Sequence, residues 1–211
     1  MKFIRRKFIG LVLVIYGVTA FSGITYAQTL IVALGDSLTE GFGVAKEEAY
    51  PHLLEQKLLQ KGHAVKVINA GISGSTSASA VSRLRWYIRT NPDIVIIALG
   101  GNDGLRGLSV EHMKSKLAEA IELALSEKIQ VLLAGMQIPR NYGTEYTESF
   151  RNAFYELAEQ YNLQMIPFLL KGVGGVSSLN QADGIHPNPE GHQILTRTVI
   201  EYLEPLLPKR Q

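Results

Sequence analysis

Three side chains in this sequence, Ser37, Asp183 and His186, are of the types that turn a serine into a nucleophile. A serine hydroxyl attacks poorly at neutral pH, so it needs a base within hydrogen-bonding reach and a third group that orients the base. Asp183 and His186 are close enough in the chain for their side chains to meet in a tight turn. An Asp-x-x-His pair alone is usually structural, so the prediction of a Ser-His-Asp catalytic triad depends on the residues that accompany it.

Three further groups could stabilise the oxyanion that forms when a serine attacks a carbonyl carbon. They are the backbone N–H groups of Ser37 and Gly74 and the side-chain amide of Asn102. Such donors are effective when a strand-to-helix turn or a rigid loop holds them in place. Glycine and asparagine are also frequent in turns for conformational reasons alone. Their coincidence with the predicted triad favours the catalytic interpretation.

The blocks that carry these residues resemble those of the SGNH hydrolases, also called GDSL esterases and lipases. The blocks are Gly35-Asp36-Ser37-Leu38, Gly74, Gly100-Gly101-Asn102-Asp103, and Asp183 with His186. The resemblance runs from about Thr29 to Leu207 and implies hydrolysis of acyl esters and thioesters through an acyl-enzyme, without a cofactor. It is greatest to a branch of bacterial periplasmic enzymes with thioesterase, arylesterase and lysophospholipase activity.

Two stretches resemble the mobile loop and the substrate-side loop of that branch, residues 100–107 and residues 138–143. Apolar side chains in and beside these loops are predicted to bind the acyl part of an ester, thioester or lysophospholipid. They are Leu105, Leu108, Ile138 and Tyr142. Two alternatives stay open: a carbohydrate deacetylase of the same family, which would use the same catalytic residues, and a noncatalytic binding module on a similar sheet.

Short apolar runs alternate with longer helical stretches, which predicts an α/β fold with helices on both faces of a parallel sheet. We expect a three-layer α/β/α domain that resembles the flavodoxin-like fold and has a five-stranded parallel sheet. The predicted strands are 30–34, 65–69, 94–99, 130–134 and 164–167, and the predicted helices are 50–60, 77–89, 109–127, 144–161 and 189–203. Ligands of such sheets bind at the carboxyl ends of the strands, where the candidate residues lie.

Residues 1–27 have the pattern of a secretory signal peptide. Four basic residues precede an apolar run over 8–21, and Thr25 and Ala27 offer small side chains before a cleavage site. The apolar run is shorter than the ~20 residues that span a bilayer, which argues against a membrane anchor. We expect cleavage, export to the periplasm or the exterior, and a single monomeric domain over residues 28–211.

Composition excludes several other functions. Loss of the four basic leader residues leaves 17 Lys and Arg against 19 Asp and Glu, and no basic run suggests nucleic-acid binding. The chain has no cysteine, so it has neither a disulfide nor a thiolate nucleophile. No third ligand accompanies His186 and His192, so no metal is expected, and His192 is placed on a solvated helix face. Ser73 lies in a near match to G-x-S-x-G that lacks the last glycine, which predicts a structural serine.

Overall fold

The computed structural model describes residues 28–208, and the predicted signal peptide of residues 1–27 lies outside them. Five parallel strands form a sheet in the order β2-β1-β3-β4-β5. The strands are β1 (Thr29–Gly35), β2 (Val65–Gly71), β3 (Ile94–Ala98), β4 (Gln130–Ala134) and β5 (Gln164–Ile166). The predicted five-stranded parallel sheet is confirmed, and each strand end lies within two residues of its predicted position.

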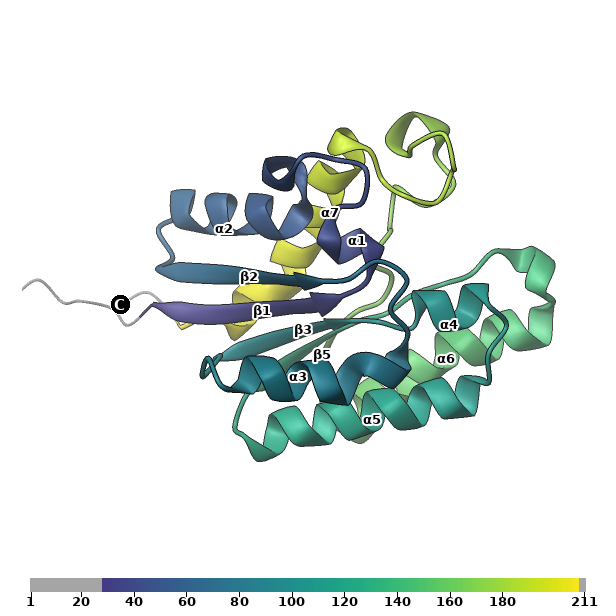
Figure 1. Cartoon of the computed structure of the whole chain (residues 1–211), viewed down its shortest axis with the longest axis horizontal. Helices are drawn as coiled ribbons and strands as arrows, with labels where there is room; N and C mark the ends of the chain where they lie inside the picture. The colour runs from purple at the N-terminus through teal and green to yellow at the C-terminus, as the bar shows by residue number, and fades with distance from the viewer. Residues whose placement is uncertain (1–27, 209–211) are drawn as a thin grey trace, which may run out of the picture.

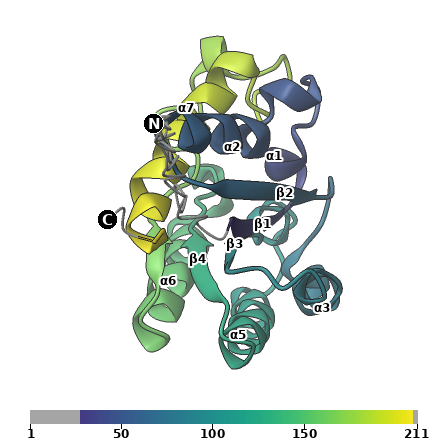
Figure 2. The same ribbon diagram turned by 90° about the vertical axis from the view of Figure 1, so that its left-hand side faces the viewer.

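Helices cover both faces of this sheet. They are α1 (Ser37–Glu40), α2 (Tyr50–Gln60), α3 (Ala80–Ile88), α4 (Gly101–Leu105), α5 (Val110–Ser126), α6 (Thr144–Gln160) and α7 (Pro189–Leu203). In Figures 1 and 2, α2 and α7 lie on one face and α3, α5 and α6 on the other, which confirms the three layers. Among residues 28–208, no helix is both long and apolar enough to cross a membrane.

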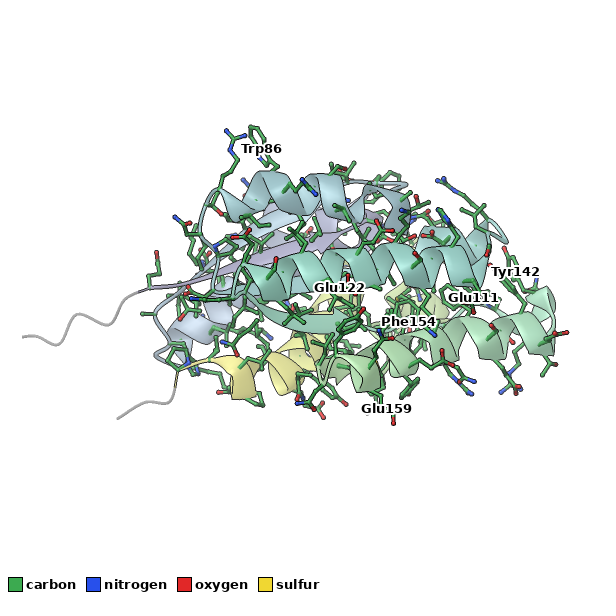
Figure 3. All side chains as sticks on the ribbon, turned by 90° about the horizontal axis from the view of Figure 1, so that it is seen from below. Trp86, Glu111, Glu122, Tyr142, Phe154 and Glu159 are labelled. Atoms are coloured by element: carbon green, nitrogen blue, oxygen red, sulfur yellow. The ribbon has the colours of Figure 1, made fainter. Side chains whose placement is uncertain are left out.

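The core lies in two layers, one on each side of the sheet. All five residues of β3 are buried, because both of its faces contact helices, and this explains its uninterrupted apolar sequence. On the α5 and α6 side, the rings of Phe150 and Phe154 pack edge to face with their centroids 5.4 Å apart. Phe154 lies between these two helices in Figure 3.

Several short elements differ from the prediction. The predicted helix 77–89 begins as a 3₁₀ turn, Ser77–Ser79, because the Ser77 hydroxyl and N–H both donate to the buried Asp103 carboxylate. The helices α1 and α4 were not expected, since four or five residues carry too little periodicity to be recognised. Both begin at the carboxyl ends of strands, at the edge where the arrows of Figure 1 point.

Candidate active site

Ser37 is the first residue of α1 and follows directly from the turn at the end of β1. Asp36 caps this helix, and its Oδ1 accepts a hydrogen bond from the Leu38 N–H at 3.1 Å. Gly35 must lack a side chain, because a Cβ there would lie 1.9 Å from Thr39 Oγ1. The resulting sharp strand-to-helix turn holds Ser37 half-buried at the edge of the sheet.

Asp183 and His186 meet in a tight turn, as the sequence predicts. Nε2 of His186 lies 2.9 Å from Ser37 Oγ, and Nδ1 lies 2.7 Å from Asp183 Oδ2. Asp183 also accepts the N–H groups of His186 and Ile185, and these bonds together with the imidazole contact lower its pKa to about 2. An ionised Asp183 favours the tautomer with the proton on Nδ1, which leaves Nε2 able to accept the serine proton.

The turn that holds His186 is anchored to the segment after α1. The ring of Phe42 packs on the imidazole of His186 with centroids 4.6 Å apart. Gln181 joins both segments: its Nε2 donates to Phe42 O at 2.6 Å, and its backbone N–H donates to His186 O at 2.7 Å. These contacts hold the imidazole against the Ser37 turn from a distant part of the chain.

Asn102 lies between the Ser37 turn and the loop that contains Gly74. Its Nδ2 donates to Ser75 O at 3.0 Å and to Asp36 Oδ2 at 3.2 Å. Gly74 has a φ of +75°, a backbone conformation that favours glycine. Among the described residues, neither the N–H of Ser37 nor that of Gly74 donates to a protein acceptor. The predicted oxyanion donors are therefore brought to the loops around Ser37.

Asp36 is a part of this site to which the sequence analysis assigned no role. Burial raises its pKa to about 6, although the hydrogen bond from the Leu38 N–H and the nearby side chains of His186 and Arg83 oppose the rise. Its carboxylate links the Ser37 turn to the Asn102 amide. The one signal in the sequence is its position before a helix, where an aspartate often acts as an N-cap.

An apolar cavity of about 480 Å³ lies beside Ser37 and His186. Its lining comes from the short helices and loops that follow the strands, and includes Leu38, Leu105, Met136, Ile138, Phe168 and Leu170. A concave apolar cavity with a few convergent polar groups is the usual form of a small-molecule site. The arrangement can hold an apolar chain next to the Ser37 hydroxyl.

A comparison with protein families matches residues 33–194 to the GDSL-like Lipase/Acylhydrolase family. The chain belongs to this family. Membership confirms the resemblance inferred from the sequence blocks and, at the level of the family, the prediction of an ester hydrolase.

Relatives of the same family match over most of the chain. Esterase TesA of Pseudomonas aeruginosa is 41% identical over 182 residues, which cover 86% of this chain and 90% of that protein. Thioesterase 1/protease 1/lysophospholipase L1 of Escherichia coli strain K12 is 34% identical over 182 residues, 86% of each chain. A crystal structure of TesA, 41% identical, superposes with a TM-score of 0.81 and covers 85% of this chain and 100% of its own. The predicted fold is that of this family.

The four residues predicted to bind the acyl chain separate into two pairs. Leu105 and Ile138 line the cavity beside Ser37. Leu108 and Tyr142 lie instead along a second, more polar hollow, next to the start of α5. Figure 3 shows Tyr142 at this end of the molecule. Leu108 and Tyr142 are therefore not part of the lining of the cavity beside Ser37, and their role in binding the acyl chain stays a prediction.

The path of the loop after α4 separates the two pairs. Gly107 has a φ of +64°, and the turn there leads the chain away from the cavity before α5 begins. The Tyr142 hydroxyl donates to Leu105 O at 2.8 Å, and the Tyr146 hydroxyl donates to Leu108 O at 2.7 Å. The two tyrosines thus bind the outer backbone of the loop. The cavity residues after β5, Phe168 and Leu170, were missed, although their position after a strand could have indicated them.

His192 is buried in α7, which corrects its expected position on a solvated face. Its Nδ1 accepts a hydrogen bond from the Tyr50 N–H at 3.3 Å, so the imidazole is an acceptor for a backbone N–H in the first turn of α2. Sequence periodicity alone does not show that α2 packs on this part of α7. In residues 28–208, no group of three or more His, Cys, Asp or Glu side chains is arranged to hold a metal ion.

His192 makes the stability of the fold depend on pH. Burial lowers its pKa to about 4, from an ordinary value of 6.5. Between these values the unfolded chain binds a proton that the folded chain does not, so stability falls as the pH is lowered. From pH 7 to pH 5 we expect this group to reduce the free energy of unfolding by about 2 kcal/mol. Urea unfolding at both pH values, with His192→Asn as the comparison, measures this loss.

A comparison with His192→Asn is needed because Asp36 changes the stability with pH in the opposite direction. Burial raises the pKa of Asp36 to about 6, so the folded chain keeps a proton that the unfolded chain loses, which favours folding in acid. Asp36 is unchanged in His192→Asn, where the asparagine oxygen can still accept the Tyr50 N–H. Equal losses of stability between pH 7 and pH 5 in the two proteins would contradict the assignment to His192.

Proposed function

We propose that this chain hydrolyses acyl esters and thioesters through an acyl-enzyme, with Ser37 as nucleophile, His186 as base and Asp183 as the orienting acid. The observation that carries the proposal is the unbroken series of hydrogen bonds from Asp183 through His186 to Ser37, at 2.7 and 2.9 Å. This order of groups is the one that serine activation requires. The names of the relatives, an esterase and a thioesterase/lysophospholipase, support the same reaction.

In the acylation step, Ser37 Oγ bonds to the substrate carbonyl carbon while its proton passes to His186 Nε2. The oxyanion accepts hydrogen bonds from the N–H groups of Ser37 and Gly74 and from the Asn102 side chain. Both N–H groups of that side chain are already engaged, so the oxyanion replaces the longer of the two bonds, at 3.2 Å to Asp36. The bond to the leaving oxygen or sulfur then breaks, and His186 returns its proton to the leaving group.

Water completes the reaction by the same route. His186 takes a proton from a water molecule, the hydroxide carbon–oxygen bond forms, and the bond to Ser37 Oγ breaks as the proton returns to serine. The products are a carboxylic acid and free enzyme. These steps use protein groups and water, so the mechanism requires no cofactor.

The lining of the cavity favours an acyl chain over an acetylated sugar. A sugar site needs several convergent polar side chains, whereas the surface beside Ser37 comes chiefly from apolar residues such as Met136, Phe168 and Leu170. We therefore place the acyl part of an ester, acyl thioester or lysophospholipid there. The carbohydrate deacetylase is the less favoured alternative, and a noncatalytic binding module would leave Ser37 inert.

Acyl length should control the rate. Each methylene transferred into an apolar cavity contributes about 0.8 kcal/mol, roughly fourfold in kcat/KM, so activity on p-nitrophenyl esters should rise steeply from acetyl to octanoyl. Gly174 lines the cavity, and a Cβ there would lie 3.3 Å from Phe168 Cζ. Gly174→Leu should reduce the octanoyl rate at least about tenfold and leave the acetyl rate nearly unchanged.

The control for that variant is Lys171→Leu, an exposed position in the same loop that does not line the cavity. Its profile across acetyl, octanoyl and palmitoyl esters should match that of the native chain. A panel with an acyl-CoA, a lysophospholipid and acetylated xylan tests the substrate class. A preference for acetylated xylan over every longer acyl ester would overturn the acyl assignment.

We also propose that residues 1–27 direct export to the periplasm or the exterior and are then removed. The basic residues, the apolar run and the small residues before Gln28 support this proposal. The remaining residues, 28–211, would act as a single domain and as a monomer. Neither a membrane anchor nor a nucleic-acid partner is part of the proposal.

A further inference from the structure

One arginine joins the backbones of two strand ends behind the candidate active site. Arg83 lies on α3, and its Nη2 donates to Gly35 O at 2.9 Å and also to Ala70 O. Gly35 ends β1 and leads into Ser37, and Ala70 lies at the end of β2 in the segment that leads to Gly74. A single guanidinium group therefore contacts the backbones that carry the nucleophile and one oxyanion donor.

The guanidinium group of Arg83 is partly buried without full hydrogen bonding, which costs free energy. No carboxylate in residues 28–208 lies within 4.0 Å of it, and its buried Nε and Nη1 have no hydrogen-bond partner. Burial lowers the pKa of Arg83, as desolvation of a cation must. A methionine or leucine would fill the same space without this penalty. The packing of α3 on the sheet alone does not explain an arginine here.

Pairing of the strands does not explain it either. Gly35 already pairs with Gly71 in the parallel ladder between β1 and β2. Gly35 O accepts the Ile72 N–H at 3.2 Å as well, so it has a partner without Arg83. Arg83 is thus an additional donor at the ends of β1 and β2, where the backbone leaves the sheet toward Ser37 and Gly74.

We propose that Arg83 is a positioning residue that sets the spacing between the Ser37 hydroxyl and the Gly74 N–H. An oxyanion gains most from donors that are already in place, and an error of about 1 Å can lower a rate on the order of 100-fold. Arg83 is not part of the cavity lining, so it acts through these two backbones and not through substrate contact. The inference rests on the proposed function, because it assumes that Ser37 and Gly74 serve the same oxyanion.

The test compares three variants of the full chain: Arg83→Met, Arg83→Lys and, as a matched control, Arg85→Met. Arg85 is an exposed arginine on the same helix. Arg85→Met therefore makes the same change of charge and residue type as Arg83→Met but does not affect the contacts at the strand ends. We expect Arg83→Met to lower kcat for p-nitrophenyl octanoate roughly 10- to 100-fold with KM within about twofold. Arg83→Lys, which retains a donor cation, should lower kcat only about fivefold.

A purely structural arginine would behave differently. It would lower the melting temperature and leave kcat of the folded enzyme within about twofold of the Arg85→Met value, and that result overturns the proposal. If Arg83→Met does not fold, Arg83→Lys decides: a kcat equal to that of the control overturns the proposal, and a reduced kcat with unchanged KM supports it.

Ser37→Ala, assayed in parallel, distinguishes failure of the proposed function from failure of the positioning role of Arg83. An inactive Ser37→Ala with a fully active Arg83→Met overturns the positioning role alone. An active Ser37→Ala overturns the proposed function and the role of Arg83 with it.

Discussion

Ser37→Ala is expected to lower kcat/KM for p-nitrophenyl octanoate by roughly 10⁴- to 10⁶-fold, as loss of the nucleophile does in serine hydrolases that act through a triad. The only hydrogen-bond partner of the Ser37 hydroxyl among the described residues is His186 Nε2, at 2.9 Å. Removal of that hydroxyl leaves no buried group of the fold without a partner, so the melting temperature should change by no more than a few degrees. Steady-state kinetics and a thermal unfolding curve measure both effects.

Ser73→Ala is the matched control for this variant. The N–H and hydroxyl of Ser73 both donate to the Glu40 carboxylate, which is a structural contact between the loop after β2 and the end of α1. Most of the activity should therefore remain in Ser73→Ala. Equal losses of activity in the two variants would refute the assignment of Ser37 as nucleophile.

The second large effect is expected for Asp183→Asn, with a fall in kcat of about 10⁴-fold, the value known for the same change in a serine-protease triad. An asparagine can still accept the N–H groups of Ile185 and His186 through its carbonyl oxygen, so the turn should persist. It no longer favours a proton on Nδ1 of His186, and the imidazole then presents the wrong tautomer to Ser37. The pre-steady-state acylation rate reports this loss directly.

Asp93→Asn controls for the loss of a carboxylate in general. Asp93 accepts the Leu30 N–H at 2.7 Å, at the edge of the sheet opposite to Ser37. The kcat of Asp93→Asn should stay within about twofold of the native value. If Asp183→Asn retained more than about a tenth of the native kcat, Asp183 would not be the group that orients His186.

The sequence was most informative where function depends on neighbouring residues. Asp183 and His186 could be paired from their spacing, and Ser37 could be placed from the strand before it, since both features are local. The strands were recognisable because burial on both faces demands apolar residues throughout. Short helices such as α4 carry no such pattern, and their glycine-rich sequence suggested only turns.

The errors and omissions arose from contacts between distant parts of the chain. Leu108 follows the turn at Gly107 and lies along the second hollow, and no residue type predicts the direction of that turn. His192 is buried because α2 packs on α7, an arrangement fixed only by the assembled sheet. Likewise, Arg83 is an ordinary residue of an amphipathic helix until the fold brings it to Gly35 O and Ala70 O.

Mass spectrometry of the protein after reaction with a fluorophosphonate, which bonds covalently to activated serines, tests whether Ser37 is the nucleophile. We expect one adduct per chain, on the peptide that contains Ser37, and none in Ser37→Ala. We also expect a slower reaction in Asp183→Asn, because His186 would activate the serine less well. No adduct on the native chain, or an adduct on Ser73 or Ser75 in place of Ser37, would contradict the assignment of Ser37.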